Sequence, residues 1–240
     1  MDIKEFREEL EKYLDVLNIE LKEEQIKQFY DYMNLLIEWN KKINLTAITE
    51  PKEIILKHFV DSLTISKYIN KKSKLIDVGT GAGFPGIPLK ILRQDIDIIL
   101  VDSLNKRIKF LDEVIEKLSL DNIKAFHGRA EEVGRNKEYR EKFDYATSRA
   151  VANTATLSEY LIPLIKKNGK CIYMKGPDID QELEEGKKAI CVLGGKILNK
   201  EEFTLPHSDI ERTIIIIEKN KNTPEKYPRR SGIPSKEPVL

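Results

Sequence analysis

A glycine-dense turn at residues 79–86 constrains this 240-residue chain more than any other stretch. The turn follows a short apolar run that ends near Asp77, and its first three glycines occupy alternate positions. Glycine lets the backbone turn sharply and lets a ligand approach without meeting a Cβ atom. Pro85 and Pro88 begin the apolar stretch that follows, and proline suits the first turn of a helix. We therefore expect a strand, a tight turn and a helix whose start faces a bound cofactor.

Two sequence frames compete for these glycines and predict different cofactors. Gly81, Gly83 and Gly86 fit the G-x-G-x-x-G pattern of dinucleotide-binding proteins. A frame that begins at Asp77 and Gly79 fits instead the first motif of S-adenosylmethionine-dependent methyltransferases. A tight strand-to-helix turn that binds no ligand is a third interpretation. The glycines alone do not decide among the three.

The apolar pattern predicts helices first, and alternating strands and helices afterwards. Helices are expected at 3–17, 22–40 and 51–68, so that residues 1–70 form an N-terminal helical extension. Seven strands are expected, at 74–78, 96–101, 122–127, 143–147, 170–174, 195–204 and 211–218. Between them, helices are expected at 85–93, 104–119, within 130–141, and at 154–166 and 178–193. Such alternation implies a parallel sheet covered on both faces.

The last two expected strands are neighbours in the sequence, with no helix between them. This arrangement implies an antiparallel edge on an otherwise parallel sheet. A plain dinucleotide-binding fold would place another strand–helix–strand unit there. We therefore predict an α/β fold with a doubly wound, seven-stranded, mostly parallel sheet over residues 71–219, which is the Rossmann-like methyltransferase fold.

Composition places the chain among ordinary soluble proteins. Its net charge is +1, and no apolar run reaches the length of a membrane span, which is roughly 18 residues. The charged first residues do not fit a signal peptide. Cys171 and Cys191 are the only cysteines and form neither a disulfide framework nor a metal-binding pattern. We expect a cytoplasmic protein that needs no membrane, no metal ion and no obligate protein partner.

Residues 220–240 form a basic, proline-rich C-terminal tail. They hold four of the ten prolines and show no periodic apolar pattern. We expect no helix there and an extended path. Lys226, Arg229 and Arg230 are candidates for contacts with phosphate groups, and a solvated flexible end is the alternative.

Polar residues follow the second and third expected strands, at the edge where a nucleoside would lie. Asp102 ends the second strand, where an acid accepts hydrogen bonds from the ribose hydroxyl groups of an adenosine moiety. Its alternative role is that of a helix N-cap. Ser103 and Leu104 follow where the backbone would wrap the ribose and adenine. Ala130 and Glu131 stand where methyltransferases read the adenine amine, with a solvated helical turn as the alternative.

Arg149 and Lys175 follow the fourth and fifth expected strands. Arg149 would point toward the reacting face, with a structural ion pair as its alternative role, and Lys175 would face the same rim. Enzymes that methylate exocyclic amines commonly carry an Asn/Asp-Pro-Pro-aromatic motif after the fourth strand. This chain lacks the motif, so methylation of an exocyclic amine is disfavoured.

Several motifs along the chain are specific when they are taken together. They are Asn40-Lys41-x-x-Asn44-Leu45-Thr46, His58-x-x-Asp61-Ser62, the Asp77 to Pro88 turn, Asp102-Ser-Leu-x-Lys106-Arg107, Ser148-Arg149-Ala150 and Tyr227-Pro228-Arg229-Arg230-x-Gly232-x-Pro234. From about residue 3 to residue 240 the chain resembles the glucose-inhibited division protein B family. The members of that family are bacterial enzymes that methylate N7 of a guanine in small-subunit ribosomal RNA.

The resemblance implies S-adenosylmethionine as co-substrate and 16S ribosomal RNA, or the assembled small subunit, as partner. The residues expected to bind the donor, from the resemblance and the glycine turn, are Gly79, Gly81, Phe84, Asp102, Ser103, Leu104, Ala130, Glu131 and Arg149.

A mechanism without a strong general base follows, because guanine N7 has a free lone pair and no proton to lose. The expected task of the protein is to align sulfur, methyl and N7 and to exclude water. We assign Arg149 and Lys175 as residues that position the substrate. Lys226, Arg229 and Arg230 are assigned as contacts to the RNA backbone.

Two other classes of protein explain part of the sequence. A nicotinamide oxidoreductase would explain the glycines and Asp102, but not the closing pair of strands. A nonenzymatic RNA-binding module would explain the basic tail, but not the residues that fit a nucleoside.

Overall fold

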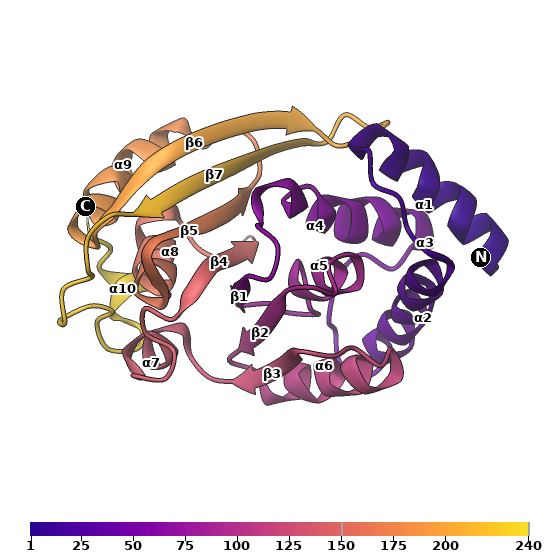
Figure 1. Ribbon diagram of the computed structural model, residues 1–240, viewed down its shortest axis with the longest axis horizontal. Coiled ribbons are helices and arrows are strands. Elements are labelled where there is room, and N and C mark those ends of the chain that lie inside the picture. Colours follow the sequence, from indigo (N-terminus) through magenta and orange to yellow (C-terminus); the bar gives the residue numbers. More distant parts are fainter. Residues whose placement is uncertain (150, 240) are drawn as a thin grey trace.

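A computed structural model of the chain describes residues 1–149 and 151–239, which are organised around a seven-stranded sheet (Figure 1). The strands are β1 (Lys74–Val78), β2 (Asp97–Asp102), β3 (Ile123–His127), β4 (Phe143–Arg149), β5 (Ile165–Lys175), β6 (Gly195–Thr204) and β7 (Glu211–Lys219). Ala150, the last residue of the motif that contains Arg149, lies outside the described residues.

Parallel pairing joins the first five strands, and the last two strands form an antiparallel edge. The order across the sheet is β3-β2-β1-β4-β5-β7-β6. β7 pairs antiparallel with both β5 and β6, whereas β1 to β5 pair in parallel. The predicted doubly wound, mostly parallel sheet is therefore confirmed. Its strand order reverses between β1 and β4, the point at which such sheets open a crevice for a ligand.

Helices cover both faces of the sheet. They are α1 (Ile3–Leu17), α2 (Glu23–Asn40), α3 (Pro51–Ile54), α4 (Asp61–Leu63), α5 (Gly86–Leu92), α6 (Asn105–Lys117), α7 (Ala130–Arg135), α8 (Thr154–Leu161), α9 (Asp180–Val192) and α10 (Ile233–Lys236). No helix within the described ranges is both long and apolar enough to cross a membrane.

Each face of the sheet has its own hydrophobic core. Along β1, Leu75 packs into the core formed with α1, α2, α5 and α6, while Ile76 and Val78 pack into the core formed with α7, α8 and α9. This alternation follows from the two-residue period of a strand. The N-terminal helices thus share a core with one face of the sheet, and a division of the chain at residue 70 stays a prediction.

Buried amides on α2 bind the ends of two other helices. Gln25 Nε2 donates to the Ile91 carbonyl at 2.7 Å, and Gln28 Nε2 donates to the Leu118 carbonyl at 2.8 Å. Both carbonyls belong to helix ends, where the last carbonyl groups have no partner within the helix. These bonds fix α2 against α5 and α6, which lie behind the glycine turn.

Gln25→Leu should lower the free energy of unfolding by about 1–3 kcal/mol, because it leaves buried helix-end carbonyls without a donor. Urea denaturation measures the change. The matched control is Gln181→Leu on α9, an exposed glutamine, for which a change within about 0.5 kcal/mol is expected. Equal stability of the two variants would contradict this role of Gln25.

The helix expected over residues 51–68 is broken into short pieces. A π-helical segment, η1 (Ile55–Val60), lies between α3 and α4, and a 3₁₀ turn, η2 (Ser66–Tyr68), follows. The Asp61 N–H bonds to the carbonyls of Leu56 and His58 rather than to that of Lys57. Such π segments are frequent at functional sites, and here the Lys57 carbonyl accepts a hydrogen bond from a site residue.

Two other expectations need correction. The helix expected over 154–166 ends at Leu161, because a 3₁₀ turn, η3 (Ile162–Leu164), contains Pro163 and leads directly into β5. The tail was expected to lack a helix, but α10 forms there with Pro234 at its second position, where proline is tolerated. The tail is also packed rather than solvated, since Thr223 and Tyr227 are buried.

Candidate active site

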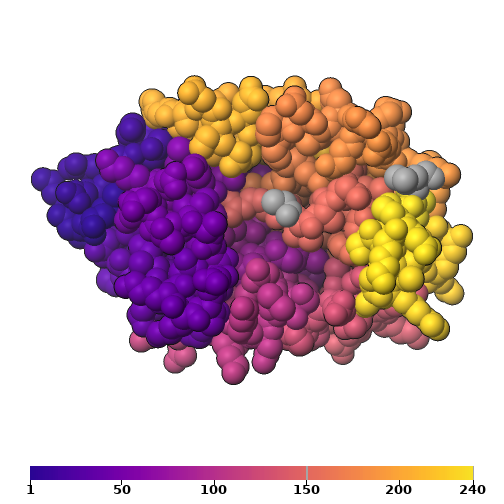
Figure 2. Space-filling view, turned by 180° about the vertical axis from the view of Figure 1, so that it is seen from behind, coloured from indigo at the N-terminus to yellow at the C-terminus, as the bar shows by residue number. Residues whose placement is uncertain are grey.

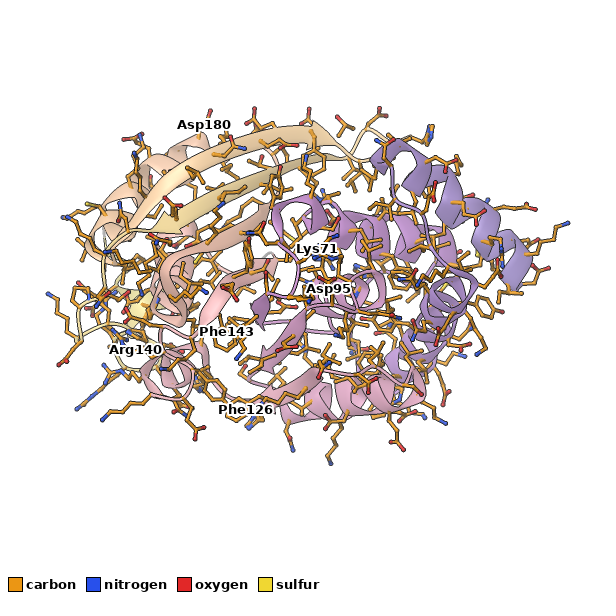
Figure 3. All side chains as sticks on the ribbon, viewed as in Figure 1. Lys71, Asp95, Phe126, Arg140, Phe143 and Asp180 are labelled. Carbon is orange, nitrogen blue, oxygen red and sulfur yellow. The ribbon has the colours of Figure 1, made fainter. Side chains whose placement is uncertain are left out.

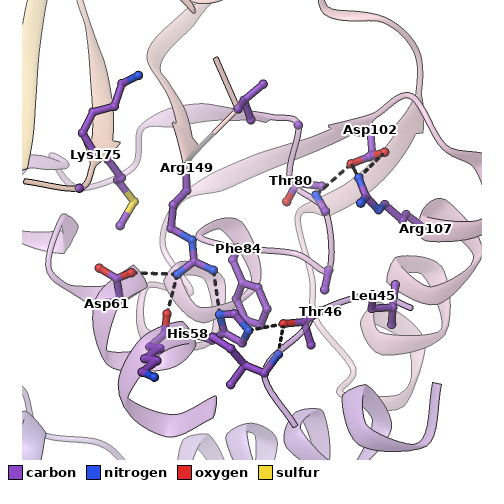
Figure 4. A pocket seen from close by; sticks show the side chains of 18 of the residues that line it. Leu45, Thr46, His58, Asp61, Thr80, Phe84, Asp102, Arg107, Arg149 and Lys175 are labelled. Atoms are coloured by element: carbon purple, nitrogen blue, oxygen red, sulfur yellow. Dashed lines mark hydrogen bonds and ion pairs between the residues drawn. The ribbon is translucent and has the colours of Figure 1, made fainter. Parts of the chain in front are cut away.

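A cavity of about 730 Å³ opens at the carboxyl ends of β1, β4 and β5, beside the glycine turn (Figure 4). A smaller cavity of about 240 Å³ adjoins it over the carboxyl ends of β2 and β3. The residues that line both are Gly79, Asp102, Ser103 and Val151. Together the cavities provide a site along the carboxyl ends of β1 to β5, across the switch point between β1 and β4.

The glycine turn leaves the backbone of Gly81 open and covers Gly86. Gly79 and Gly81 have φ values of 71° and 62°, which favour glycine, and a Cβ atom on Gly81 would meet no atom within 4 Å. A Cβ atom on Gly86 would lie 2.2 Å from Leu100 Cδ2. Gly86 therefore permits α5 to pack against β2 and has no free face for a pyrophosphate.

Asp77 organises the turn from beneath. Its Oδ2 accepts hydrogen bonds from the Thr80 hydroxyl at 2.6 Å and from the Gly86 N–H at 2.9 Å. Burial raises the pKa of this carboxyl group to about 7, although these hydrogen bonds oppose the shift. Its Oδ1 is buried and has no hydrogen-bond partner among the described residues.

Asp102 lies where the two cavities meet. Its carboxylate accepts hydrogen bonds from the N–H groups of Gly81 and Leu104, both at 2.9 Å, and pairs with Arg107 at 3.1 Å. It thus ties the turn after β1 to the loop after β2. Ser103 lines both cavities, whereas the Leu104 side chain is exposed and lines neither.

The smaller cavity contains the residues expected to meet adenine. Ala130 and Glu131, at the start of α7, line it together with Tyr160 of α8. Glu131 is buried, so the alternative of a solvated acidic turn does not apply to it. Apart from the Leu104 side chain, the site residues predicted after β1, β2 and β3 thus lie along the two cavities, and their acceptors and open glycine face fit an adenosine-containing donor.

Arg149 links the end of β4 to the N-terminal helices. Its Nη1 donates to the Lys57 carbonyl at 3.0 Å and to Asp61 Oδ2 at 3.2 Å, and its Nη2 lies 3.1 Å from His58 Nδ1. The guanidinium also lies over the Phe84 ring, 4.9 Å from its centre. Arg149 therefore lines the cavity and also forms the structural ion pair that was its alternative role.

The protonation of His58 follows from these contacts. A guanidinium only donates, so His58 Nδ1 accepts from Arg149 and Nε2 carries the ring proton. Burial, followed by the charge of Arg149, lowers the pKa of His58 to about 3. The ring is therefore neutral, stacks on Phe84 at 4.3 Å, and donates from Nε2 to the Thr46 hydroxyl at 2.8 Å.

Thr46 is left with a hydroxyl proton to donate. Its Oγ1 accepts from His58 Nε2–H at 2.8 Å and from the Ile48 N–H at 3.0 Å. A hydroxyl group has two acceptor lone pairs and one donor, so only the O–H remains. Thr46 lines the larger cavity and so presents a donor to whatever binds there (Figure 4).

Lys175 lines the same cavity, but its ammonium group has protein partners. Its Nζ binds Glu182 at 2.8 Å and the Ala152 carbonyl. In Figure 4 the side chain extends away from Arg149. Lys175 thus ties β5 to α9, and a contact between its remaining donor and the substrate stays a prediction.

Sequence reasoning gave no site role to Thr46, Asp61, Arg107 or Arg212. Asp61 is buried and accepts from both Arg149 and Arg212, the latter at 3.2 Å. The spacing His58-x-x-Asp61 on a helix was a usable signal, because residues three apart share a face. Arg212 on β7 gave no local signal, since the contact spans 151 residues.

The chain can now be compared with known proteins. Residues 25–212 match the GidB family, described as rRNA small subunit methyltransferase G. The chain belongs to this family. A protein named Ribosomal RNA small subunit methyltransferase G from Desulforamulus reducens is 55% identical over 225 residues, with 93% of this chain and 94% of that protein covered. One of the same name from Lactobacillus acidophilus is 51% identical over 243 residues, with both chains fully covered.

Solved structures support the fold. TYW2 from M. jannaschii, in complex with AdoMet, is 15% identical with a TM-score of 0.52, and the match covers 66% of this chain and 73% of that one. MtNAS, in complex with MTA and tNA, is 14% identical with a TM-score of 0.54, covering 79% of this chain and 71% of that one. At such low identity the likeness concerns the fold alone.

His58→Asn should change how stability depends on pH. Below pH 6.5 the unfolded chain binds a proton on this ring, whereas the folded chain does not until the pH approaches about 3. The free energy of unfolding of the wild type should therefore fall, relative to the variant, by up to about 1.4 kcal/mol per pH unit below pH 6.5. Urea denaturation between pH 7 and 4 measures the difference.

The control for this prediction is His207→Asn at an exposed position, measured over the same range of pH. Parallel curves for the wild type and His58→Asn would mean that the buried ring does not stay neutral.

Proposed function

We propose that this protein transfers the methyl group of S-adenosylmethionine to N7 of a guanine in 16S ribosomal RNA, either free or in the assembled small subunit. The observation that carries the proposal is the junction at Asp102 of a nucleoside-sized cavity with a larger, open one. Membership of the rRNA small subunit methyltransferase G family supports the nature of the acceptor. A cytoplasmic location is consistent with this acceptor.

The donor would lie along the glycine turn. The backbone of Gly79 and Gly81 would face the donor, and Asp102 would accept hydrogen bonds from its ribose hydroxyl groups. Ala130 and Glu131 would enclose its adenine. When bound, S-adenosylmethionine supplies a methyl group on a positively charged sulfur. Asp77 is buried beneath the turn, and burial raises its pKa to about 7, so a cationic donor bound nearby would favour the ionised form of this carboxyl group.

No residue of the larger cavity needs to remove a proton. Guanine N7 carries a lone pair and no hydrogen, and both ring nitrogens of His58 already have partners. Arg149 is bound by three groups, and the negative charge of Asp61 balances its positive charge. Its guanidinium is therefore fixed in position over the Phe84 ring. The contribution of these residues is to hold donor and acceptor in line and to exclude water.

Thr46 has the hydrogen-bonding polarity that guanine requires. The guanine edge that contains N7 also carries O6, which is an acceptor, whereas adenine presents an N6 amino donor at that position. A hydroxyl that can only donate would bind O6 and would repel the adenine amine. We assign Thr46 as a residue that selects guanine within the proposed reaction.

Thr46→Val should reduce kcat/KM for RNA methylation by about tenfold or more, because one hydrogen bond to the base is lost. Thr46→Ser, which retains the hydroxyl, should stay within about threefold of the wild type. Donor affinity, measured by titration with S-adenosylhomocysteine, should be unchanged in both. An unchanged rate for Thr46→Val, or a parallel loss of donor affinity, would remove Thr46 from this role.

Incubation with labelled S-adenosylmethionine tests the function itself. The acceptors compared are naked small-subunit RNA, assembled small subunits and unrelated nucleic acids, and the modified base is mapped afterwards. We expect label at one guanine N7, with no label when that guanine is replaced. RNA binding without methyl transfer would favour a binding module, and thermal protection by a nicotinamide cofactor instead of the methyl donor would favour an oxidoreductase.

Lys226 and Arg230 are exposed and are proposed as contacts to the RNA backbone. Arg229, which was assigned with them, has a different environment. Its guanidinium is paired with a buried glutamate of α8, so Arg229 anchors the tail to the domain, and a contact between its remaining donor and the RNA backbone stays a prediction.

A further inference from the structure

The C-terminal tail lies across α7 and α8, on the side of the sheet opposite the N-terminal helices. In the space-filling view the tail, in yellow, packs against the orange and salmon surface of the domain (Figure 2). The stick view places Arg140 beside the tail (Figure 3). Tyr227 belongs to the hydrophobic core that α7, α8 and α9 form with the sheet. The tail is therefore part of the folded domain.

Arginines at the end of α7 and just after it bind the first half of the tail through its carbonyl groups. Arg140 donates to the carbonyls of Thr223 at 2.8 Å and Tyr227 at 2.6 Å. Arg135 Nε donates to the carbonyl of Pro228 at 2.7 Å. Because these are backbone acceptors, the contacts fix the path of the chain rather than particular side chains.

Arg229 forms the central anchor. Its backbone N–H and its Nη2 donate to the Glu159 carboxylate at 2.6 and 2.7 Å, and its Nε lies at 3.0 Å from the same group. The Glu159 side chain is 1% exposed. A carboxylate so deeply buried needs a charged partner, and Arg229 supplies it from the tail.

The second half of the tail reaches the smaller cavity. Gly232 and Ser235 line that cavity together with Glu131 and Tyr160. The Gly232 N–H donates to Glu131 Oε1 at 2.8 Å, and the Thr156 hydroxyl donates to the carbonyl of Pro234 at 3.0 Å. The tail therefore supplies one wall of the cavity and holds one oxygen of its buried carboxylate.

We propose that residues 232–235 form the outer wall of the adenosine end of the donor site and position Glu131 for the adenine amine. With Oε1 held by the Gly232 N–H, the carboxylate has a fixed orientation, and Oε2 is left to accept from the ligand. The ligand class is an adenosine derivative, including the product S-adenosylhomocysteine. The inference rests on the proposed function only in taking the donor to be such a compound.

Arg229 has a positioning role in this arrangement. It does not touch the cavity, but its pairing with Glu159 holds the chain three residues before Gly232. Arg229 thus acts on donor binding, whereas Lys226 and Arg230 of the same tail remain proposed contacts to the RNA backbone.

The direct test is a chain ending at residue 231, which retains Arg229 and Tyr227 but lacks the wall. Calorimetric titration with S-adenosylhomocysteine should give a Kd at least about tenfold weaker than that of the full chain, equivalent to about 1.4 kcal/mol. Affinity for adenosine should fall by a similar factor, because the lost wall lies at the adenine end. RNA affinity at fixed salt should change by less than about twofold.

A double-mutant comparison separates positioning from a general structural effect. If the tail acts through Glu131, then Glu131→Ala and the truncation together should weaken binding less than the product of their separate effects. If the two fold-changes in Kd instead multiply in full, the positioning role is overturned. Within the full chain, Arg229→Met should weaken S-adenosylhomocysteine binding, while Lys236→Met, which removes an exposed charge from α10, should not.

Hydrogen exchange on the unaltered protein gives a test that needs no variant. S-adenosylhomocysteine should slow exchange of the backbone amides of residues 229–233 and of Ser235, because the ligand closes against this segment. Unchanged exchange there, or a truncated chain that binds S-adenosylhomocysteine as tightly as the full one, would overturn the inference. A full chain that binds no S-adenosylhomocysteine would instead overturn the proposed function.

Discussion

The guanidinium of Arg149 joins two parts of the molecule that are far apart in the sequence. It lies at the end of β4 and binds the Lys57 carbonyl, Asp61 and His58 in the π-helical region of the N-terminal segment. The charge is largely withdrawn from water, so its partners must lie close and stay fixed. Residues from both parts line the larger cavity, so its shape depends on a single buried cation.

The protonation pattern of the site follows from that cation. Because Arg149 can only donate, His58 must accept on one nitrogen and donate from the other, and the Thr46 hydroxyl then keeps its own proton to donate. A histidine bound on both sides cannot act as a base. This agrees with a reaction at guanine N7, which has no proton to remove, and it leaves recognition and alignment as the tasks of the surrounding residues.

The donor side of the site is built differently, from backbone and carboxylates. Gly81 exposes its backbone, Asp102 links the loops after β1 and β2, and Glu131 is held by the tail. Arg229, which was predicted to contact RNA, pairs with the buried carboxylate of Glu159. When a tail is folded onto the domain, its net positive charge does not by itself indicate which molecule the tail binds.

The sequence by itself determined the sheet and its antiparallel edge. These depend on local rules, namely strand and helix periodicity, which act over a few residues. Only the tertiary structure decided the partners of Arg149, Lys175 and Arg229. The Arg149–Asp61 pair spans 88 residues and the Arg229–Glu159 pair spans 70. Such contacts depend on how the helices and strands pack against one another, and no pattern in the nearby sequence indicates which charged residues will pair.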